Sequence, residues 1–199
     1  EAGRASFRCT DSRASIGLYC RGVDAAQIES ARNKAMNTAV AQTNASDIDY
    51  INPVISSTKN VFEMMLEAKV ARTGLQLKSD NTPAHEVSAV IGLAGMGQGT
   101  IVLSFSERVA CSILNQLVGV TADQIDHEVC DAVGEVANMV AGGAKAQLAQ
   151  YDLNLSIPNV VTGTGHVIHF PSNVMPICIS FESDFGPFTI EVGFTRPTH

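Results

Sequence analysis

Apolar residues recur at helical spacing between Thr121 and Tyr151, a stretch that contains no proline. At steps of about 100° per residue, the apolar positions gather on one side and predict a helix face directed at a core. That face holds Ile125, Val129, Ala132, Val136, Val140 and Gly143. Thr121 and Gln124 have the spacing of a capping box, so the sequence predicts that the helix begins there.

A second stripe with the same period predicts another long helix, which ends near Ala68. Its apolar positions are Ile51, Val54, Ile55, Thr58, Val61, Phe62, Met65 and Leu66. Residues 46–49 offer an N-terminal cap. Asn52 followed by Pro53 suits the start or a kink of the helix, because proline is tolerated at the first helical position. Both helices are expected to pack on the same core.

Alternation of apolar and polar residues predicts strands in two groups, one after each long helix. The predicted strands span residues 70–78, 86–94 and 100–105 in the first group, and 154–162, 166–170, 175–182 and 188–194 in the second. A shorter helix over residues 106–118, ended by Gly119, follows the first group. The pattern predicts an α+β fold, an internally duplicated unit of helix plus antiparallel strands with two long helices packed on a β-sheet.

The internal repeat can be aligned residue by residue. Placing Asn60 over Asn138 sets Ser57 over Glu135, so only the second copy carries the acidic residue. We therefore expect one functional helix face per chain.

The polar side of the helix between residues 121 and 151 holds Asp131, Glu135, Asn138 and Gly142. Like charges at i and i+4 destabilise a helix by a few tenths of a kcal/mol, and Asn and Gly are poorer helix formers than Ala. Local rules broken together on one face indicate a site. The alternative is a solvated face whose carboxylates are drawn to a helix N-terminus. This alternative accounts poorly for Glu135 and leaves Asn138 unexplained.

Composition places the chain among ordinary globular proteins, with 199 residues, 45% apolar residues, 17% charged residues and a net charge of −7. No apolar run reaches the roughly 18 residues needed to cross a bilayer, and the start of the sequence lacks the apolar region of a secretory signal. A cytoplasmic protein without a membrane partner is therefore expected. Clustered basic residues are absent from this acidic sequence, which argues against a nucleic-acid partner.

Several smaller patterns are interpreted as structural. The glycines of residues 92–99 precede a strand instead of a helix, which favours a hairpin turn over a phosphate-binding loop. His166 and His169 would point to opposite faces of a strand, so they are not expected to bind one metal ion. The five cysteines form no CxxC pair, and those at 111, 130 and 178 are expected to pack in the core.

The first part of the chain differs in composition from the rest, because it is rich in arginine, serine and glycine. We expect residues 1–45 to form an N-terminal extension, mobile or non-native, and residues 46–199 to form the folded domain.

The polar face belongs to a longer motif, which consists of Asp131, Glu135, Asn138, Met139, Val140, Gly142 and, within residues 155–158, Pro158. This motif resembles the signature of the CheX branch of the CheC/CheX/FliY chemotaxis phosphatases. Other family-like segments follow in the same order, at residues 51–53, 57–62, 90–93, 99–105, 163–166 and 181–186. The resemblance extends from about Asp47 to Phe194 and implies a CheC-like fold.

The resemblance also implies an enzyme, a protein aspartyl-phosphate phosphatase that dephosphorylates a CheY-like response regulator in chemotaxis or related two-component signalling. Asn138 would position the attacking water and Glu135 would contact a lysine of the regulator, while Asp131 and Gly142 would lie against the partner. An amide cannot act as a general base at neutral pH, which agrees with a water-orienting task.

No cofactor of the protein's own is implied, because the phosphorylated regulator would bind Mg²⁺. CheX-type relatives are homodimers joined through their sheets, so a homodimer is expected. Two alternatives stay open. One is a non-catalytic module of the same fold that binds a receiver domain or a flagellar switch partner, and the other is a structural dimer whose polar helix face is only solvated.

Overall fold

The structure is a computed structural model that describes residues 45–171 and 174–195. The predicted extension at residues 1–45 lies, up to residue 44, outside the described residues. The elements are α2 (Ala45–Met64), β1 (Val70–Leu77), β2 (Val87–Ala94), β3 (Gln98–Phe105), α3 (Glu107–Val118), α4 (His127–Gln147), the short 3₁₀ helix η1 (Ala149–Tyr151), β4 (Asn154–Leu155), β5 (Asn159–Thr162), β6 (Ile177–Ser183) and β7 (Gly186–Thr195).

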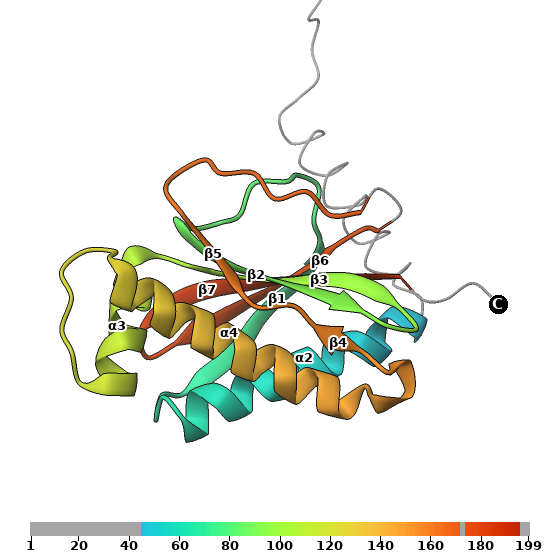
Figure 1. Cartoon of the computed structure of the whole chain (residues 1–199), viewed down its shortest axis with the longest axis horizontal. Coiled ribbons are helices and arrows are strands. Elements are labelled where there is room, and N and C mark those ends of the chain that lie inside the picture. Colours follow the sequence, from blue (N-terminus) through green and yellow to red (C-terminus); the bar gives the residue numbers. More distant parts are fainter. Residues whose placement is uncertain (1–44, 172–173, 196–199) are drawn as a thin grey trace, which may run out of the picture. The chain divides into compact units, whose positions relative to one another are not determined.

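The described strands form one seven-stranded sheet in the order β1-β6-β7-β3-β2-β4, with β5 also paired to β2. Every pairing is antiparallel. The two halves of this order meet where β3 pairs with β7. One half is the β6-β7 hairpin flanked by β1, which follows α2, and the other is the β2-β3 hairpin flanked by β4 and β5, which follow α4 (Figure 1). This arrangement confirms the predicted α+β fold and its internal repeat.

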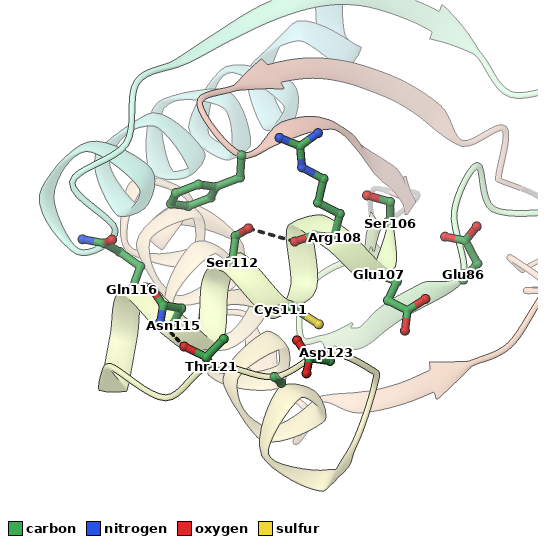
Figure 2. A pocket seen from close by; sticks show the side chains of 12 residues that line it. Glu86, Ser106, Glu107, Arg108, Cys111, Ser112, Asn115, Gln116, Thr121 and Asp123 are labelled. Carbon is green, nitrogen blue, oxygen red and sulfur yellow. Dashed lines mark hydrogen bonds between the residues drawn. The ribbon is translucent and has the colours of Figure 1, made fainter.

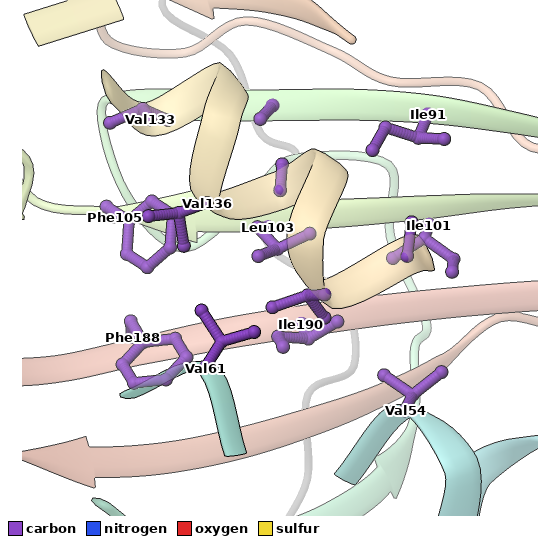
Figure 3. Close-up of a cluster of buried hydrophobic side chains, with 14 of the residues drawn as sticks. Val54, Val61, Ile91, Ile101, Leu103, Phe105, Val133, Val136, Phe188 and Ile190 are labelled. Atoms are coloured by element: carbon purple, nitrogen blue, oxygen red, sulfur yellow. The ribbon is translucent and has the colours of Figure 1, made fainter. Parts of the chain in front are cut away.

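Helices α2 and α4 lie side by side on one face of the sheet, and α3 packs beside α4 (Figure 1). Figure 3 shows Val54 and Val61 of α2 and Val136 of α4 directed at the sheet residues Leu103 and Ile190. All five side chains are buried. Two long helices packed on a sheet were predicted, and most of their apolar positions form this core. Met65 does not, because it follows the end of α2 and is exposed.

The limits of α4 differ from the prediction. The carboxylate of Asp126 accepts a 2.9 Å hydrogen bond from the backbone N–H of Val129 and caps the helix, which begins at His127. Thr121 is engaged elsewhere, because its hydroxyl accepts a 3.2 Å hydrogen bond from the Asn115 amide. The predicted capping box at Thr121 is therefore wrong. The helix also ends earlier than expected, at Gln147.

Helix α2 begins at Ala45 and contains Pro53, so of the two roles considered for Asn52 and Pro53, a start or a kink, the start is excluded. Proline lacks the N–H that an interior helical position would donate, and its buried ring instead adds to the core side of the helix. The helix stops at Met64 and not near Ala68, since Glu67 adopts a positive φ of 47° in the connection to β1.

The second face of the sheet carries the buried polar residues Ser88, Ser104 and Glu191 and lies beneath residues 78–86, 163–171 and 174–176 (Figure 1). His166 Nε2 lies 2.8 Å from the hydroxyl of Ser88, and Lys78 pairs with the buried carboxylate of Glu191. Residues 166–170 form no strand, which corrects the prediction, because they cross over this face instead of pairing along an edge. In the described part of the chain, no helix combines the length and apolar character that crossing a bilayer requires.

Candidate functional site

The outer face of α4 carries the polar residues that the sequence placed there. Asp131, Glu135 and Asn138 are exposed, and Gly142 is half-buried on the same side. The opposite side of the helix holds Val129, Val133, Val136, Ala137, Val140, Ala141 and Ala144, all buried. Packing of that apolar side fixes the rotation of the helix, so the polar side must face outward.

Glu135 and Asn138 stand one turn apart on α4, where side chains at i and i+3 are neighbours with Cβ atoms about 5–6 Å apart. Among the described residues, neither side chain makes a hydrogen bond or an ion pair. A carboxylate and an amide therefore lie next to each other with their hydrogen-bonding groups available to a partner. Their catalytic roles stay predictions.

A groove with a volume of about 560 Å³ runs between α4 and the segment that connects β4 to β5. The α4 wall is formed by Cys130, Asp131, Gly134, Glu135 and Asn138, and the opposite wall by Leu155, Ser156, Ile157, Pro158 and Val160. The two walls meet at Gly134, where an added Cβ would lie 3.7 Å from a Val160 methyl group and 3.9 Å from Pro158 Cβ. Pro158, predicted as part of the motif, thus lies against Gly134 and lines the same groove as Glu135.

Electrostatically the groove is acidic. Asp131 Oδ2 lies 3.2 Å from His127 Nδ1 one turn earlier, but both side chains are largely exposed, so this pair contributes little to stability. Burial, together with the charges of Asp126 and Asp131, raises the pKa of the Cys130 thiol and keeps it protonated. The groove therefore offers carboxylates, an amide and apolar carbons.

The corresponding surface of the first copy is not available. Ser57, which the internal alignment sets over Glu135, is only 4% exposed, and its hydroxyl donates a hydrogen bond to the backbone of α4. Asn60, aligned with Asn138, is exposed but has no acidic neighbour at the aligned position. At the positions aligned with Glu135 and Asn138, helix α2 therefore presents no carboxylate and amide pair.

A larger hollow of about 840 Å³ lies along α3, between the Phe185 turn and the loop before α4. Figure 2 shows Arg108, Cys111 and Asp123 at its surface, with hydrogen bonds from Ser112 to the Arg108 carbonyl and from Asn115 to Thr121. Its polar groups are mixed in charge and partly satisfied by one another. It contains none of the motif residues, so size alone does not identify the site.

Comparison with known proteins places this geometry in a family. A family model described as chemotaxis phosphatase CheX matches residues 87–182. A CheY-P phosphatase CheX from Thermotoga maritima is 30% identical over 106 residues, which cover 51% of this chain and 68% of that protein. The chain belongs to the CheX family of chemotaxis phosphatases. The resemblance stated from the motif is confirmed, and so is the prediction of a phosphatase.

Solved structures agree with the CheX assignment. A CheC-like superfamily protein from Shewanella sp. PV-4 is 36% identical, with a TM-score of 0.69 over 74% of this chain and 98% of that chain. A CheX from Borrelia burgdorferi, solved as a CheX-CheY-BeF3-Mg²⁺ complex, has a TM-score of 0.62 over 75% of this chain and 99% of that chain. At 23% identity the second comparison shows the fold alone. The predicted CheC-like fold is confirmed.

The wall opposite α4 was only partly foreseen. The motif included Pro158 but gave no role to Ile157, whose side chain is 85% exposed at the groove. A proline inside the single strand predicted over residues 154–162 was the available signal, because proline is confined to edges, strand starts and bulges. Among the described residues, no cluster of three or more His, Cys, Asp or Glu side chains is arranged to hold a metal ion.

Proposed function

We propose that this chain hydrolyses the aspartyl phosphate of a CheY-like response regulator in chemotaxis or related two-component signalling. One observation carries the proposal. In this member of the CheX family, Glu135 and Asn138 are exposed, make no hydrogen bond or ion pair among the described residues, and line the groove that also contains Pro158. The T. maritima relative is a CheY-P phosphatase, and the B. burgdorferi relative was solved with CheY. The T. maritima relative supports a phosphorylated receiver as the substrate.

Asn138 would position the attacking water. Its side-chain amide can accept one hydrogen bond and donate others, but it cannot take a proton at neutral pH. Water adds to phosphorus, the bond from phosphorus to the aspartyl oxygen breaks, and the products are aspartate and inorganic phosphate. The proton of the water passes to a phosphate oxygen or to solvent. Phosphoryl transfer proceeds through a loose transition state that asks mainly for positioning and charge balance, so one oriented amide suffices for this step.

Glu135 would form an ion pair with a lysine of the regulator and fix the depth to which Asn138 enters the phosphorylated pocket. Asp131, one turn earlier, would make a weaker polar contact with the same partner. Gly142, where an added Cβ would meet no atom within 4 Å, would leave the face thin enough for close docking. Mg²⁺ would arrive bound to the phosphorylated regulator and not to this chain.

Phosphate release from a phosphorylated CheY-like receiver tests the proposal. We expect Asn138→Ala to lower kcat by about 10²-fold or more, because positioning is the main catalytic contribution. Glu135→Ala is expected to raise KM and also to lower kcat. Asn60→Ala is the matched control, since Asn60 is an exposed asparagine at the aligned position of α2 and should leave both constants unchanged.

Two outcomes would overturn the catalytic assignment. Equal rates for wild type, Asn138→Ala and Glu135→Ala would remove both residues from the chemistry. Tight binding of the receiver without accelerated phosphate release would instead favour the non-catalytic binding module.

We also propose that residues 46–199 form the phosphatase domain, that residues 1–45 are an extension, and that the protein works in the cytoplasm, where response regulators are phosphorylated. A homodimer is proposed as well. Strand β1 supports it, because within the described part of the chain β1 pairs only with β6 and leaves its other edge open to a second copy.

A further inference from the structure

The wall of the groove opposite α4 contains a β-bulge. Strand β4 pairs Leu155 with Leu93 of β2, and β5 pairs Asn159 with Val90, so three residues of one chain segment face two residues of β2. The extra residue lies within 156–158. Bulges re-aim side chains and are over-represented beside active sites.

Ser156 holds the bulge in place. Its backbone N–H donates to the carbonyl oxygen of Gly92 at 2.9 Å, and its hydroxyl accepts from the N–H of Gly92 at 2.9 Å. The same hydroxyl donates to the carbonyl oxygen of Ile157 at 3.0 Å. One side chain thus ties the bulge to β2 and orders the residue that follows it.

Pro158 and Val160 fix the other end, because both pack against α4 at Gly134. Between these two attachments, Ile157 is turned outward into solvent with 85% of its surface exposed. A large apolar side chain that points into water gains nothing for the fold of the monomer. It does gain free energy when a partner covers it, since burial of apolar surface is favourable.

We propose that Ile157 is an apolar anchor that docks the phosphorylated receiver domain, a role that rests on the proposed function. The groove places it across from Glu135 and Asn138, so one partner can contact all three residues. The receiver would present an apolar patch beside its phosphorylated pocket, and the lysine that meets Glu135 would lie between them. Ser156 is then a positioning residue that acts through Ile157.

If Ile157 has this role, its substitution should change KM for the phosphorylated receiver and leave kcat nearly unchanged. Ile157→Ala should raise KM for the phosphorylated receiver by roughly tenfold, and Ile157→Asp by more, because an anchor at an interface carries a large share of the affinity. Both should leave kcat within about twofold. Ser156→Ala should raise KM by less than Ile157→Ala, because it loosens the bulge without removing the anchor. Ile157 is too exposed for these changes to endanger folding.

Val161→Ala is the matched control. It lies on the same edge segment and is 38% exposed, but it points away from the groove, because its neighbour Val160 faces α4 and successive strand residues alternate. Its KM should equal that of wild type.

A parallel titration with the same receiver activated by beryllofluoride and Mg²⁺ separates this inference from the proposed function. If wild type hydrolyses the phosphate and Ile157→Asp binds and reacts as well as wild type, the docking role of Ile157 is overturned and the phosphatase activity is supported. If wild type binds without hydrolysis and Ile157→Asp loses binding, the anchor stands and catalysis is overturned. Absence of both binding and hydrolysis in wild type overturns both.

Discussion

The hydroxyl of Ser57 donates a 2.7 Å hydrogen bond to the backbone carbonyl oxygen of Val140, which joins α2 to α4 inside the core. Beside this bond the two helices approach so closely that a Cβ at Gly143 would overlap the Ser57 hydroxyl. Gly142, the next residue back along α4, borders open space. Packing between α2 and α4 therefore requires glycine at position 143, whereas packing within the chain does not require it at position 142.

Gly143→Ala should destabilise the fold by about 1–3 kcal/mol, because Ser57 must move and its buried hydrogen bond is lost. Gly142→Ala should instead stabilise it by about 0.5–1 kcal/mol, since alanine is the better helix former and nothing opposes its methyl group. Urea unfolding of the two variants measures the difference. Equal stabilities would mean that the contact between α2 and α4 is looser than the structure has it.

The same Gly142→Ala variant tests the predicted partner contact. If the receiver approaches the backbone at Gly142, the added methyl group should raise KM while the protein itself becomes more stable. An unchanged KM would remove Gly142 from the partner-binding face and leave Glu135 and Asn138 unaffected.

Asp126, and not Thr121, should act as the N-cap of α4. Asp126→Ala is expected to cost about 0.5–2 kcal/mol of stability, because the N–H of Val129 loses its acceptor at the helix end. Thr121→Ala should change the free energy of unfolding by less than about 0.5 kcal/mol, as an exposed loop substitution usually does. Thermal or urea unfolding of the two variants measures these changes. A larger loss of stability for Thr121→Ala than for Asp126→Ala would show that Thr121 caps the helix after all.

The capping error shows what the sequence could and could not determine. Both Thr121 and Asp126 are good cap residues, and the choice depends on Asn115 of α3, which binds the Thr121 hydroxyl. That contact joins residues only six positions apart, but the period of the apolar residues does not register it. The face of α4 was predictable because its apolar period fixes which side is buried, so Glu135 and Asn138 had to be exposed.

The opposite wall of the groove was also only partly predictable from the sequence, and here the cause is strand pairing. Alternation predicted one strand over residues 154–162, but the register against β2 shifts by one residue between Leu155 and Asn159. A one-residue shift changes which side chains point outward. The exposure of Ile157 follows from pairing with a strand more than sixty positions earlier, which no local pattern contains.

Asp131 should contribute to partner binding and not to chemistry. Asp131→Asn is expected to raise KM by less than about fivefold with kcat unchanged, because one exposed charge contributes little. Its ion pair with His127 is exposed on both sides, so His127→Ala should alter neither stability nor KM appreciably. Steady-state kinetics on the two variants measures this. A fall in kcat comparable with that of Asn138→Ala would place Asp131 in the reaction.

The ion pair of Lys78 and Glu191 should make stability depend on pH. Glu191 is 1% exposed, and burial raises its pKa despite the opposing pull of Lys78, 2.7 Å away. Burial acts to lower the pKa of Lys78, but hydrogen bonds and charges from Glu191 and Asp80 outweigh it and raise the pKa. Since the folded state holds the Glu191 proton more tightly than the unfolded state does, this group reduces stability as pH rises above about 4.5, the ordinary pKa of glutamate.

Lys78→Met removes the cation and leaves the carboxylate of Glu191 buried without a partner. The loss of stability should be about 3–5 kcal/mol at pH 7 and should shrink as pH falls toward 4.5, because a protonated Glu191 needs no counter-charge. Adding Glu191→Gln to Lys78→Met should remove this site's contribution to the pH dependence of the variant's own free energy of unfolding, whereas Asp80→Asn, at an exposed position, should have little effect. Urea unfolding at pH 5 and pH 7 measures these differences. An equal loss at both values would mean that the buried carboxylate does not titrate in this range and that the cost lies in packing of the Lys78 side chain.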